Sequence, residues 1–300
     1  MGGKMGSADH LVQMMEGYSK ALYSSFYLFK NYDLLFDCGE GCAARLDRHQ
    51  FRARWIAISH YHHDHTGGLK GLFLARAYTK GSNDRPLTVF YPESSPSLSR
   101  QRAWLKKELP RLPFRLDWIG VREGFAFQLN DPESRIPLEL HALRADHSVR
   151  ERCVAYKIVE KRRRLKTELA HLPEKEIAAL ARGTSRDELT EPYDKNILVY
   201  SGDSEPLAAD SISDADLLLH DATFLMEEDR EEQGHASVEQ VLTLGTEAAV
   251  KGIVLCHISH RYSLRSVRRR VPYLVRKRGF TGTVWVQWLD RLECVYRNGS

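Results

Sequence analysis

The sequence lacks the features that define several broad classes of protein. It contains no run of about 18 apolar residues, the length that a membrane-spanning helix needs. Residues 1–7 are rich in glycine and lead into no apolar segment, which is not the pattern of a secretory signal peptide. The cysteines form no CxxC pair, and their wide spacing predicts reduced thiols at Cys38, Cys42, Cys153, Cys256 and Cys294. We therefore expect a cytoplasmic protein without a disulfide framework.

The composition is that of an ordinary globular protein. Apolar residues make up 42% and charged residues 28% of the 300 positions, which excludes a disordered chain. A chain of this length supports one large domain or two small ones. The net charge of +4 is modest, but basic residues gather at positions 100–111 and 261–278. Such clusters suit a phosphate backbone, although a charge run taken alone more often marks the solvated face of a helix.

Several apolar runs predict buried strands, and four of them end in a histidine or an aspartate. Side chains at the carboxyl ends of strands are where α/β folds build binding sites, because a rigid sheet holds the loops that carry them. The four runs are residues 55–59 before His60, 197–200 before Asp203, 217–219 before His220 and Asp221, and 253–255 before His257. These strand ends are candidates for a functional site.

The remaining pattern is also that of mixed strands and helices. Residues 26–29 and 34–36 are β-prone runs separated by a short polar turn, which predicts a hairpin. A turn-rich loop at 92–99 precedes a basic helix near 101–109. Residues 118–158 hold short alternating runs typical of a sheet. The pattern therefore favours an α/β protein.

Residues 60–65 read HYHHDH and follow directly on a buried strand. His60 and His62 lie two positions apart, so in extended backbone their imidazoles point to the same side and can hold one metal ion together. Asp64 and His65 follow where the chain turns and can face a second ion. A solvated polar loop is the alternative, but four histidines and an aspartate within six residues are unusual for one.

Two clustered ions need further ligands from elsewhere in the chain. The candidates are His147, Asp203 and His257. Neutral imidazole and carboxylate ligands without a thiolate suit Zn²⁺ or Mn²⁺, and their mixture indicates a hydrolytic rather than a structural site.

Over nearly its whole length the sequence resembles the metallo-β-lactamase superfamily, and within it the ribonuclease Z-like branch. The HxHxDH signature of the superfamily matches residues 60–65. Four further segments resemble motifs of ribonuclease Z: FDCGEG at 36–41, HDATF at 220–224 in place of HEATF, GHAS at 234–237 in place of GHST, and HISHRY at 257–262, which fits HxSxRY. Each match is weak alone, but together and in family order they are strong.

The resemblance implies an α/β fold, a four-layer αββα sandwich formed by residues 1–300 as a single domain. It implies two metal ions, zinc or alternatively manganese. One ion is expected on His60, His62 and His147, the other on Asp64, His65 and His257, with Asp203 as the bridge.

Such a pair of ions defines the expected chemistry. Two divalent ions roughly 3.5–4 Å apart can hold a bridging hydroxide and lower the pKa of water to ~7, which makes the hydroxide a nucleophile toward a phosphodiester. By the resemblance, His235 works beside the metals, and we expect Asp221 to orient it as a proton donor to the leaving oxygen. A surface histidine is the alternative for His235.

Other residues near the motifs allow two interpretations. Asp64 is either a metal ligand or a base that orients the hydroxide. Arg261 either contacts the substrate phosphate or braces acidic side chains. We expect His63 and His260 to be exposed to solvent, and His220 to have a supporting place at its strand end.

The sequence departs from ribonuclease Z in two places. Residues 11–18 lack the LGTG turn that opens those proteins. The tRNA-binding arm of the family carries a PxKxxR motif, of which Pro173 and Lys175 supply the first half, but Ala178 stands where the arginine belongs. Residues 161–191, rich in charge, Ala, Leu and Glu, predict a helical excursion from the core in place of that arm.

Three functions are therefore compared. The first is an endonuclease that trims the 3′ ends of tRNA precursors, and the second is a phosphodiesterase for small or cyclic nucleotide esters. A non-catalytic binding protein is the third, but the complete ligand set argues against it, because buried ligands without metal would be unsatisfied polar groups. A thioesterase or β-lactamase is disfavoured by the HxSxRY run at 257–262. The resemblance further implies a homodimer in which one subunit's arm holds substrate for the other, and no membrane partner.

Overall fold

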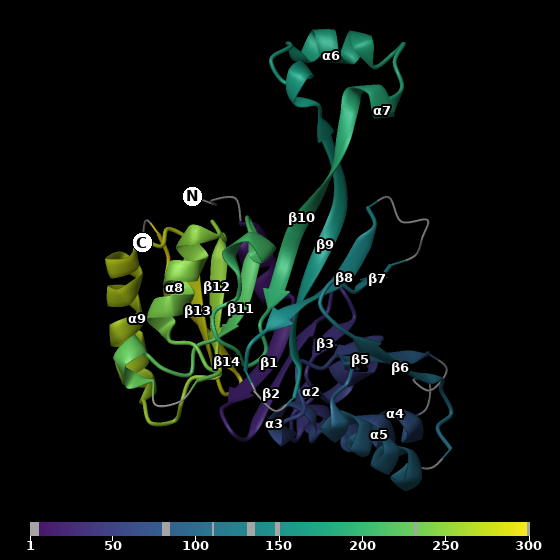
Figure 1. The fold of residues 1–300 in the computed structure, drawn as a ribbon, viewed down its shortest axis with the longest axis vertical. Coiled ribbons are helices and arrows are strands. Elements are labelled where there is room, and N and C mark those ends of the chain that lie inside the picture. The colour runs from purple at the N-terminus through teal and green to yellow at the C-terminus, as the bar shows by residue number, and fades with distance from the viewer. Residues whose placement is uncertain are drawn as a thin grey trace.

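Two β-sheets form the centre of the protein (Figure 1). The computed structural model describes residues 6–79, 85–109, 111–130, 136–147, 151–230 and 233–298. The first sheet has its strands in chain order, antiparallel at β1–β2–β3 and parallel from β3 to β6. These strands are β1 (Met15–Lys20), β2 (Ser24–Phe29), β3 (Leu34–Phe36), β4 (Trp55–Ala57), β5 (Leu87–Pro92) and β6 (Leu116–Val121). The predicted hairpin at 26–29 and 34–36 is thus confirmed as β2 and β3.

The second sheet has the order β14-β13-β12-β11-β10-β9-β8-β7. Its middle strands β10, β11, β12 and β13 are parallel to one another, and the other neighbours are antiparallel. The strands are β7 (Ala126–Gln128), β8 (Leu138–Ala145), β9 (Cys153–Leu165), β10 (Thr190–Tyr200), β11 (Leu217–Asp221), β12 (Gly252–Cys256), β13 (Thr283–Trp288) and β14 (Arg291–Tyr296).

Helices cover the outer faces of both sheets (Figure 1). Those on the first sheet are α2 (Cys42–Leu46), α3 (His63–Thr66), α4 (Leu69–Tyr78) and α5 (Pro96–Glu108). Those on the second are α8 (Val238–Glu247) and α9 (Leu264–Arg278), and α1 (Ser7–Gln13) precedes β1. Short 3-10 turns lie at η1 (Asp47–Arg52), η2 (Thr167–Leu169), η3 (Ala209–Ile212) and η4 (Glu227–Asp229).

Three apolar layers hold these elements together, as strand β2 illustrates. All six residues of β2 are buried. Because side chains alternate across a strand, Phe26 and Leu28 pack toward the helices α2, α4 and α5, whereas Tyr27 and Phe29 face the second sheet. A third layer packs α8 and α9 against the second sheet. The layer order is helix, sheet, sheet, helix, and the predicted α/β sandwich is confirmed.

Strands β9 and β10 run far beyond the sheet and carry the short helices α6 (Glu174–Leu180) and α7 (Arg186–Leu189) at their tip, drawn in teal and green at the top of Figure 1. We call residues 161–191 the arm. The segment was expected to be largely helical, and its two ends are strands instead. Residues 161–165 pair with 190–194 as antiparallel strands, and ion pairs such as Arg164 to Glu191 at 2.8 Å join them across the ladder. Cross-strand charge pairs, which a search for apolar periodicity does not detect, therefore form this part of the hairpin.

The loop predicted at 92–99 was also partly wrong, because helix α5 begins at Pro96. The hydroxyl of Ser95 accepts a hydrogen bond from the backbone N–H of Leu98, and Pro96 occupies the first turn, where its missing N–H costs nothing. The basic run at 100–111 lies mainly on this helix, and the run at 261–278 mainly on α9.

Two findings concern the cysteines and the helices of the described residues. The five cysteines form no disulfide with one another within the described residues, and Cys294 is the exposed one among them. Among the helices of the described residues, none combines the length and the apolar character needed to cross a membrane.

Candidate metal centre

The candidate ligands gather at the carboxyl ends of strands from both sheets. His60 follows β4, Asp203 follows β10, Asp221 ends β11 and His257 follows β12 directly. Neighbouring parallel strands end at the same edge of a sheet, so the fold brings these distant positions together.

The first group of candidate ligands consists of His60, His62 and His147. The Nδ1 atom of His62 lies 3.0 Å from Nε2 of His60 and 3.2 Å from Nε2 of His147. Nitrogens bound tetrahedrally to one zinc ion are about 3.3–3.4 Å apart, since Zn–N bonds are about 2.0–2.1 Å long. The three nitrogens are therefore spaced as ligands of a single zinc-sized ion.

The second group consists of Asp64, His65, Asp203 and His257, all buried. Oδ2 of Asp203 lies 3.2 Å from Nε2 of His65 and 3.3 Å from Nε2 of His257. Oδ2 of Asp64 lies 3.6 Å from each of the same two nitrogens. This arrangement surrounds a second small volume with two carboxylates and two imidazoles.

Asp203 lies between the two groups, because its Oδ2 atom is also 3.9 Å from Nε2 of His60. The buried Nε2 atoms of His65 and His257 have no hydrogen-bond partner in the described part of the chain. Buried polar atoms are rarely left in that state. A cation between these atoms would satisfy them, so the residues fit a metal ion.

The charge balance of the second group also suits a cation. Burial alone would raise the pKa of Asp203, but the imidazoles of His257 and His65 hold it well below its usual range. Burial alone would lower the pKa of His65, but the carboxylates of Asp203 and Asp37 raise it well above its usual range. In the first group, burial lowers the pKa of His60 well below its usual value and keeps the ring neutral, as a ligand must be.

Asp37 forms hydrogen bonds that orient candidate ligands, a role that its sequence context did not predict. Its Oδ2 atom accepts hydrogen bonds from Nδ1 of His65 at 2.6 Å, from the Tyr200 hydroxyl at 2.6 Å and from the Ser59 hydroxyl at 2.8 Å. Ser59 in turn lies 3.0 Å from Nδ1 of His60. One carboxylate thus orients a ligand of each group, a common arrangement in metal sites. The available signal was its place directly after strand β3, like the ligands after their strands.

Two glycines allow the loops of the centre to approach closely. A Cβ atom on Gly39 would lie 2.2 Å from the carbonyl oxygen of Asp64. Gly234 has a φ of +98°, and a Cβ there would lie 2.2 Å from the carbonyl oxygen of His147. The carbonyl of Gly234 accepts a hydrogen bond from Nδ1 of His147 at 2.8 Å. The GHAS segment therefore positions a ligand in addition to its own histidine.

His235 and Asp221 form a pair beside both ligand groups. Nδ1 of His235 lies 2.6 Å from Oδ2 of Asp221, and the His235 ring stacks on that of His257 with centroids 5.2 Å apart. Burial alone would lower the pKa of His235, but the Asp221 carboxylate raises it to about 9. Asp221 is fully buried and also accepts hydrogen bonds from the backbone and hydroxyl of Thr223. The pair can hold a proton at the edge of the centre.

The remaining histidines and Arg261 lie outside the ligand groups. Arg261 is exposed, with its guanidinium 5.3 Å from the ring centroid of Phe224. His63 and His260 are exposed, as expected. His220 is fully buried on β11, with Nδ1 2.8 Å from the carbonyl oxygen of Asp221.

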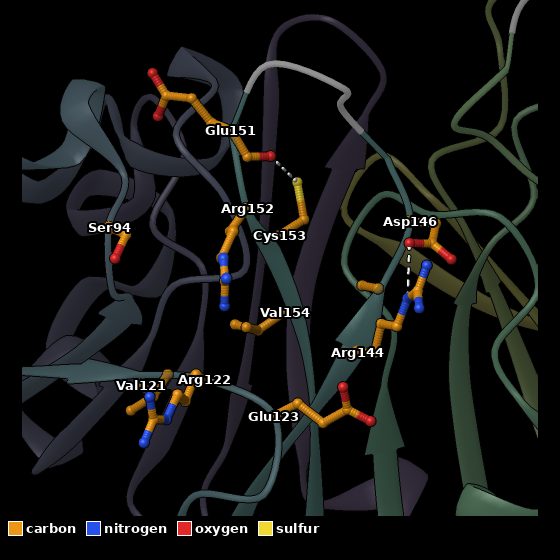
Figure 2. Close-up of a pocket in the computed structure, with 11 residues that line it drawn as sticks. Ser94, Val121, Arg122, Glu123, Arg144, Asp146, Glu151, Arg152, Cys153 and Val154 are labelled. Carbon is orange, nitrogen blue, oxygen red and sulfur yellow. Dashed lines mark hydrogen bonds and ion pairs between the residues drawn. The ribbon is translucent and has the colours of Figure 1, made fainter.

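A cavity of about 480 Å³ lies beside strands β6, β8 and β9, and none of the candidate ligands is among its described lining residues (Figure 2). Asp146 on its wall precedes the ligand His147, and the backbone N–H of Val154 donates to the carbonyl of Ser59, next to His60. Figure 2 shows the side chains that line it: Ser94, Val121, Arg122, Glu123, Arg144, Asp146, Glu151, Arg152, Cys153 and Val154. The mixture of arginines and carboxylates makes this a polar space.

Comparison with known proteins gives matches to both the sequence and the fold. A family described as anti-Pycsar protein Apyc1 matches residues 14–99. A ribonuclease Z from Methanosarcina mazei is 29% identical over 256 residues, which are 77% of this chain and 79% of that protein. A ribonuclease Z from Bacillus cereus is 27% identical over 252 residues, 76% of this chain and 78% of that protein.

Two solved structures share the fold. The metallo-β-lactamase fold protein YhfI from Bacillus subtilis superimposes with a TM-score of 0.62 at 20% identity, over 93% of this chain and 99% of YhfI. The short form of human tRNase Z superimposes with a TM-score of 0.59 at 21% identity, over 82% of this chain and 93% of that one.

The chain has the fold of the metallo-β-lactamase fold protein YhfI and of human tRNase Z, and its candidate ligands cluster at the strand ends of that fold. The sequence is similar to ribonuclease Z proteins over about three quarters of its length, which supports a metal-dependent hydrolase. The predicted resemblance to ribonuclease Z and the predicted class of enzyme are both borne out.

Proposed function

We propose that this protein hydrolyses phosphodiester bonds with two metal ions, as an endonuclease that trims the 3′ ends of tRNA precursors. The observation that carries the proposal is the position of Asp203, whose Oδ2 atom is close to ligand nitrogens of both groups. A carboxylate shared in this way suits a pair of ions better than one ion with spare ligands. The ribonuclease Z relatives favour RNA as the substrate.

The ions are proposed to be zinc, with manganese as the alternative, because the donors are imidazoles and carboxylates without a thiolate. When bound, two such ions supply a lowered pKa for water and neutralise charge on the phosphate. The proposed ligands are His60, His62 and His147 for one ion, Asp64, His65 and His257 for the other, and Asp203 for both.

His235 is proposed as the proton donor to the leaving oxygen. Its Nδ1 atom is engaged by Asp221, so Nε2 is the atom that can deliver the proton. The Asp221 carboxylate raises the pKa of this ring, which favours its protonated form. Asp64 is proposed as a ligand, with the orientation of water as its alternative role. For Arg261, the contact with Phe224 favours support of the loop over contact with the substrate.

The test uses two neighbouring histidines of one motif. His62→Ala removes a nitrogen from the first group, whereas His63→Ala alters a side chain that is 78% exposed. We expect wild type and His63→Ala to bind two equivalents of zinc and to cleave precursor tRNA and bis-p-nitrophenyl phosphate. His62→Ala should lose metal and both activities. Undiminished turnover by His62→Ala would overturn the ligand assignment.

A phosphodiesterase for small or cyclic nucleotide esters is the second candidate. Two observations favour it: the tip of the arm is helical, and Ala178 stands where ribonuclease Z has the arginine of PxKxxR. Hydrolysis of small esters without cleavage of precursor tRNA would select this candidate. We also propose that the chain folds as one domain and forms a homodimer, the assembly in which an arm would hold RNA for the other subunit.

A further inference from the structure

The turn between β1 and β2 exposes two apolar side chains, and the backbone of one of them has an unfavourable conformation. Leu22 is 91% exposed and Tyr23 is 50% exposed. Leu22 has a φ of +65°, in the left-handed region that a bulky residue adopts at a cost in free energy. Strained residues of this kind concentrate at functional sites. The turn also lies next to the segment in which the sequence departs from the LGTG turn of ribonuclease Z.

Both ends of this turn are anchored to loops of the second ligand group. On β1, the hydroxyl of Ser19 accepts a hydrogen bond from the backbone N–H of His257 at 2.8 Å. On β2, the hydroxyl of Ser24 donates to the carbonyl of Glu40 at 2.8 Å. A Cβ on Gly39 would lie 2.6 Å from that hydroxyl and 2.2 Å from the carbonyl of Asp64. The turn therefore projects from a position between Asp64 and His257.

A second segment lies beside the turn. Ser19 and Leu289 exchange backbone hydrogen bonds of 3.0 and 3.1 Å, which brings the neighbouring Trp288 to the same rim. The rings of Trp288 and His260 have centroids 5.7 Å apart. The Lys20 ammonium lies 4.9 Å from the centroid of the Tyr23 ring. The rim beside the second ligand group thus combines aromatic rings with a cation.

We propose that this rim, made by Lys20, Leu22, Tyr23 and Trp288, binds the nucleoside next to the scissile phosphate. The inference rests on the proposed phosphodiester hydrolysis and names a subsite for its substrate. A base has an apolar face and stacks on exposed aromatic rings, and a neighbouring cation attracts the phosphate that each nucleotide carries. Tyr23 stacks on the base, Leu22 contacts its edge, and Lys20 faces the phosphate. The exposed apolar surface and the positive charge are complementary to a nucleotide, whereas an apolar protein partner would leave Lys20 without a counter-charge.

The test compares two esters with the same leaving group in the zinc-loaded protein. Thymidine 5′-(p-nitrophenyl phosphate) carries a nucleoside, and methyl p-nitrophenyl phosphate does not. We expect Tyr23→Ala to raise the KM for the thymidine ester relative to the methyl ester by about tenfold, the loss typical of one base–aromatic stack. Tyr23→Phe should restore the wild-type ratio, because it keeps the ring. Tyr78→Ala, at a tyrosine 74% exposed on α4, is the matched control and should leave the ratio unchanged.

A second measurement is independent of turnover. Calorimetric titration with thymidine 5′-monophosphate should give a dissociation constant about tenfold weaker for Tyr23→Ala than for wild type and Tyr23→Phe. Equal KM ratios and equal dissociation constants in wild type and Tyr23→Ala would overturn the subsite. If wild type hydrolyses neither ester, the proposed function fails, and the titration still decides whether the rim binds a nucleotide.

Discussion

At the scale of single residues, Asp37 is predicted to control metal affinity although it is not itself a proposed ligand. It contacts His65 directly and reaches His60 through Ser59, so it orients one ligand in each group. Asp37→Asn would present a neutral amide to Nδ1 of His65. We expect metal affinity to fall about 10–100-fold, the usual cost of losing such a supporting carboxylate.

Competition with a fluorescent zinc chelator measures this change. Asparagine tolerates the left-handed backbone of position 37, where φ is +53°, so folding should be preserved. Tyr200→Phe removes one hydrogen bond from the same oxygen and is expected to weaken binding by a smaller factor. Unchanged zinc affinity in Asp37→Asn would show that the ligands hold their orientation without it.

Substitution of His235 is expected to affect turnover and not metal binding. The residue lies beside the proposed ligands but is proposed to act on the leaving oxygen. Replacing it with alanine should lower kcat by about 10²–10⁴, the range for one positioned proton donor, while the zinc content stays at the wild-type value. Asp221→Asn should lower kcat as well, since Asp221 engages Nδ1 of His235 at 2.6 Å. A loss of zinc in His235→Ala would instead assign the ring to the metal ions.

Single residues also show which parts of the candidate site can be predicted from the sequence and which cannot. His60, His62, Asp64 and His65 were accessible because a run of imidazoles and a carboxylate directly after a buried strand is rare outside metal sites. Asp37 was not singled out, because one aspartate after a strand is common. Its role depends on contacts with residues 22 and 163 positions away. Spacing along the chain does not reveal contacts of that kind.

At the scale of elements, the junction of α8 and α9 depends on one buried carboxylate. Glu239 on α8 is 3% exposed and accepts hydrogen bonds from Lys277 at 3.0 Å and Arg278 at 3.1 Å. Burial alone would raise the pKa of Glu239. Hydrogen bonds, the strongest of them from Lys277, outweigh burial and lower this pKa below its usual value. Ionised Glu239 therefore stabilises the folded state more than it does the unfolded chain.

The pH dependence follows from the direction of that shift. Because the folded pKa is below the unfolded value of about 4.3, the stabilisation is present above that pH and is lost as the pH falls toward the folded pKa. Glu239→Gln should reduce the free energy of unfolding by about 1–2 kcal/mol at pH 7, since both basic partners are partly exposed. Urea unfolding measures the difference in the free energy of unfolding between wild type and Glu239→Gln. A difference that persists undiminished below pH 4 would contradict the assignment to charge.

Element boundaries were predictable where a local signal existed. The hairpin of β2 and β3 was found from two apolar runs around a polar turn. A capping serine and a first-turn proline mark the start of α5 at Pro96, so the sequence holds a signal for this helix start. The many turn residues around it favoured a loop instead. The arm differs, because Lys161 to Leu165 form a strand only through pairing with residues 190–194. Pairing over that separation leaves no local periodicity to detect.

At the scale of the whole molecule, the sandwich and the arm are separable in structure. The ligands lie where strands of the two sheets end, whereas the arm extends away from the sheets (Figure 1). The sequence relatives cover about three quarters of the chain, and the fold likeness to YhfI covers 93%. Because the candidate ligands lie in the sandwich, we expect the proposed hydrolysis to depend on the sandwich and the choice between a large and a small substrate to depend on the arm.

Shortening the arm tests that division of roles. Leu165 and Thr190 are directly opposite in the antiparallel ladder, so residues 166–189 can be replaced by an Asn-Gly turn that preserves the register. If the arm holds RNA, cleavage of precursor tRNA should fall at least about tenfold, which corresponds to about 1.4 kcal/mol of lost binding. Hydrolysis of bis-p-nitrophenyl phosphate should be retained, because the ligand groups are untouched. Sedimentation of the same variant reports whether the arm also contributes to a dimer. Equal loss of both activities would mean that the arm stabilises the sandwich, and full retention of both would show that the arm does not hold RNA.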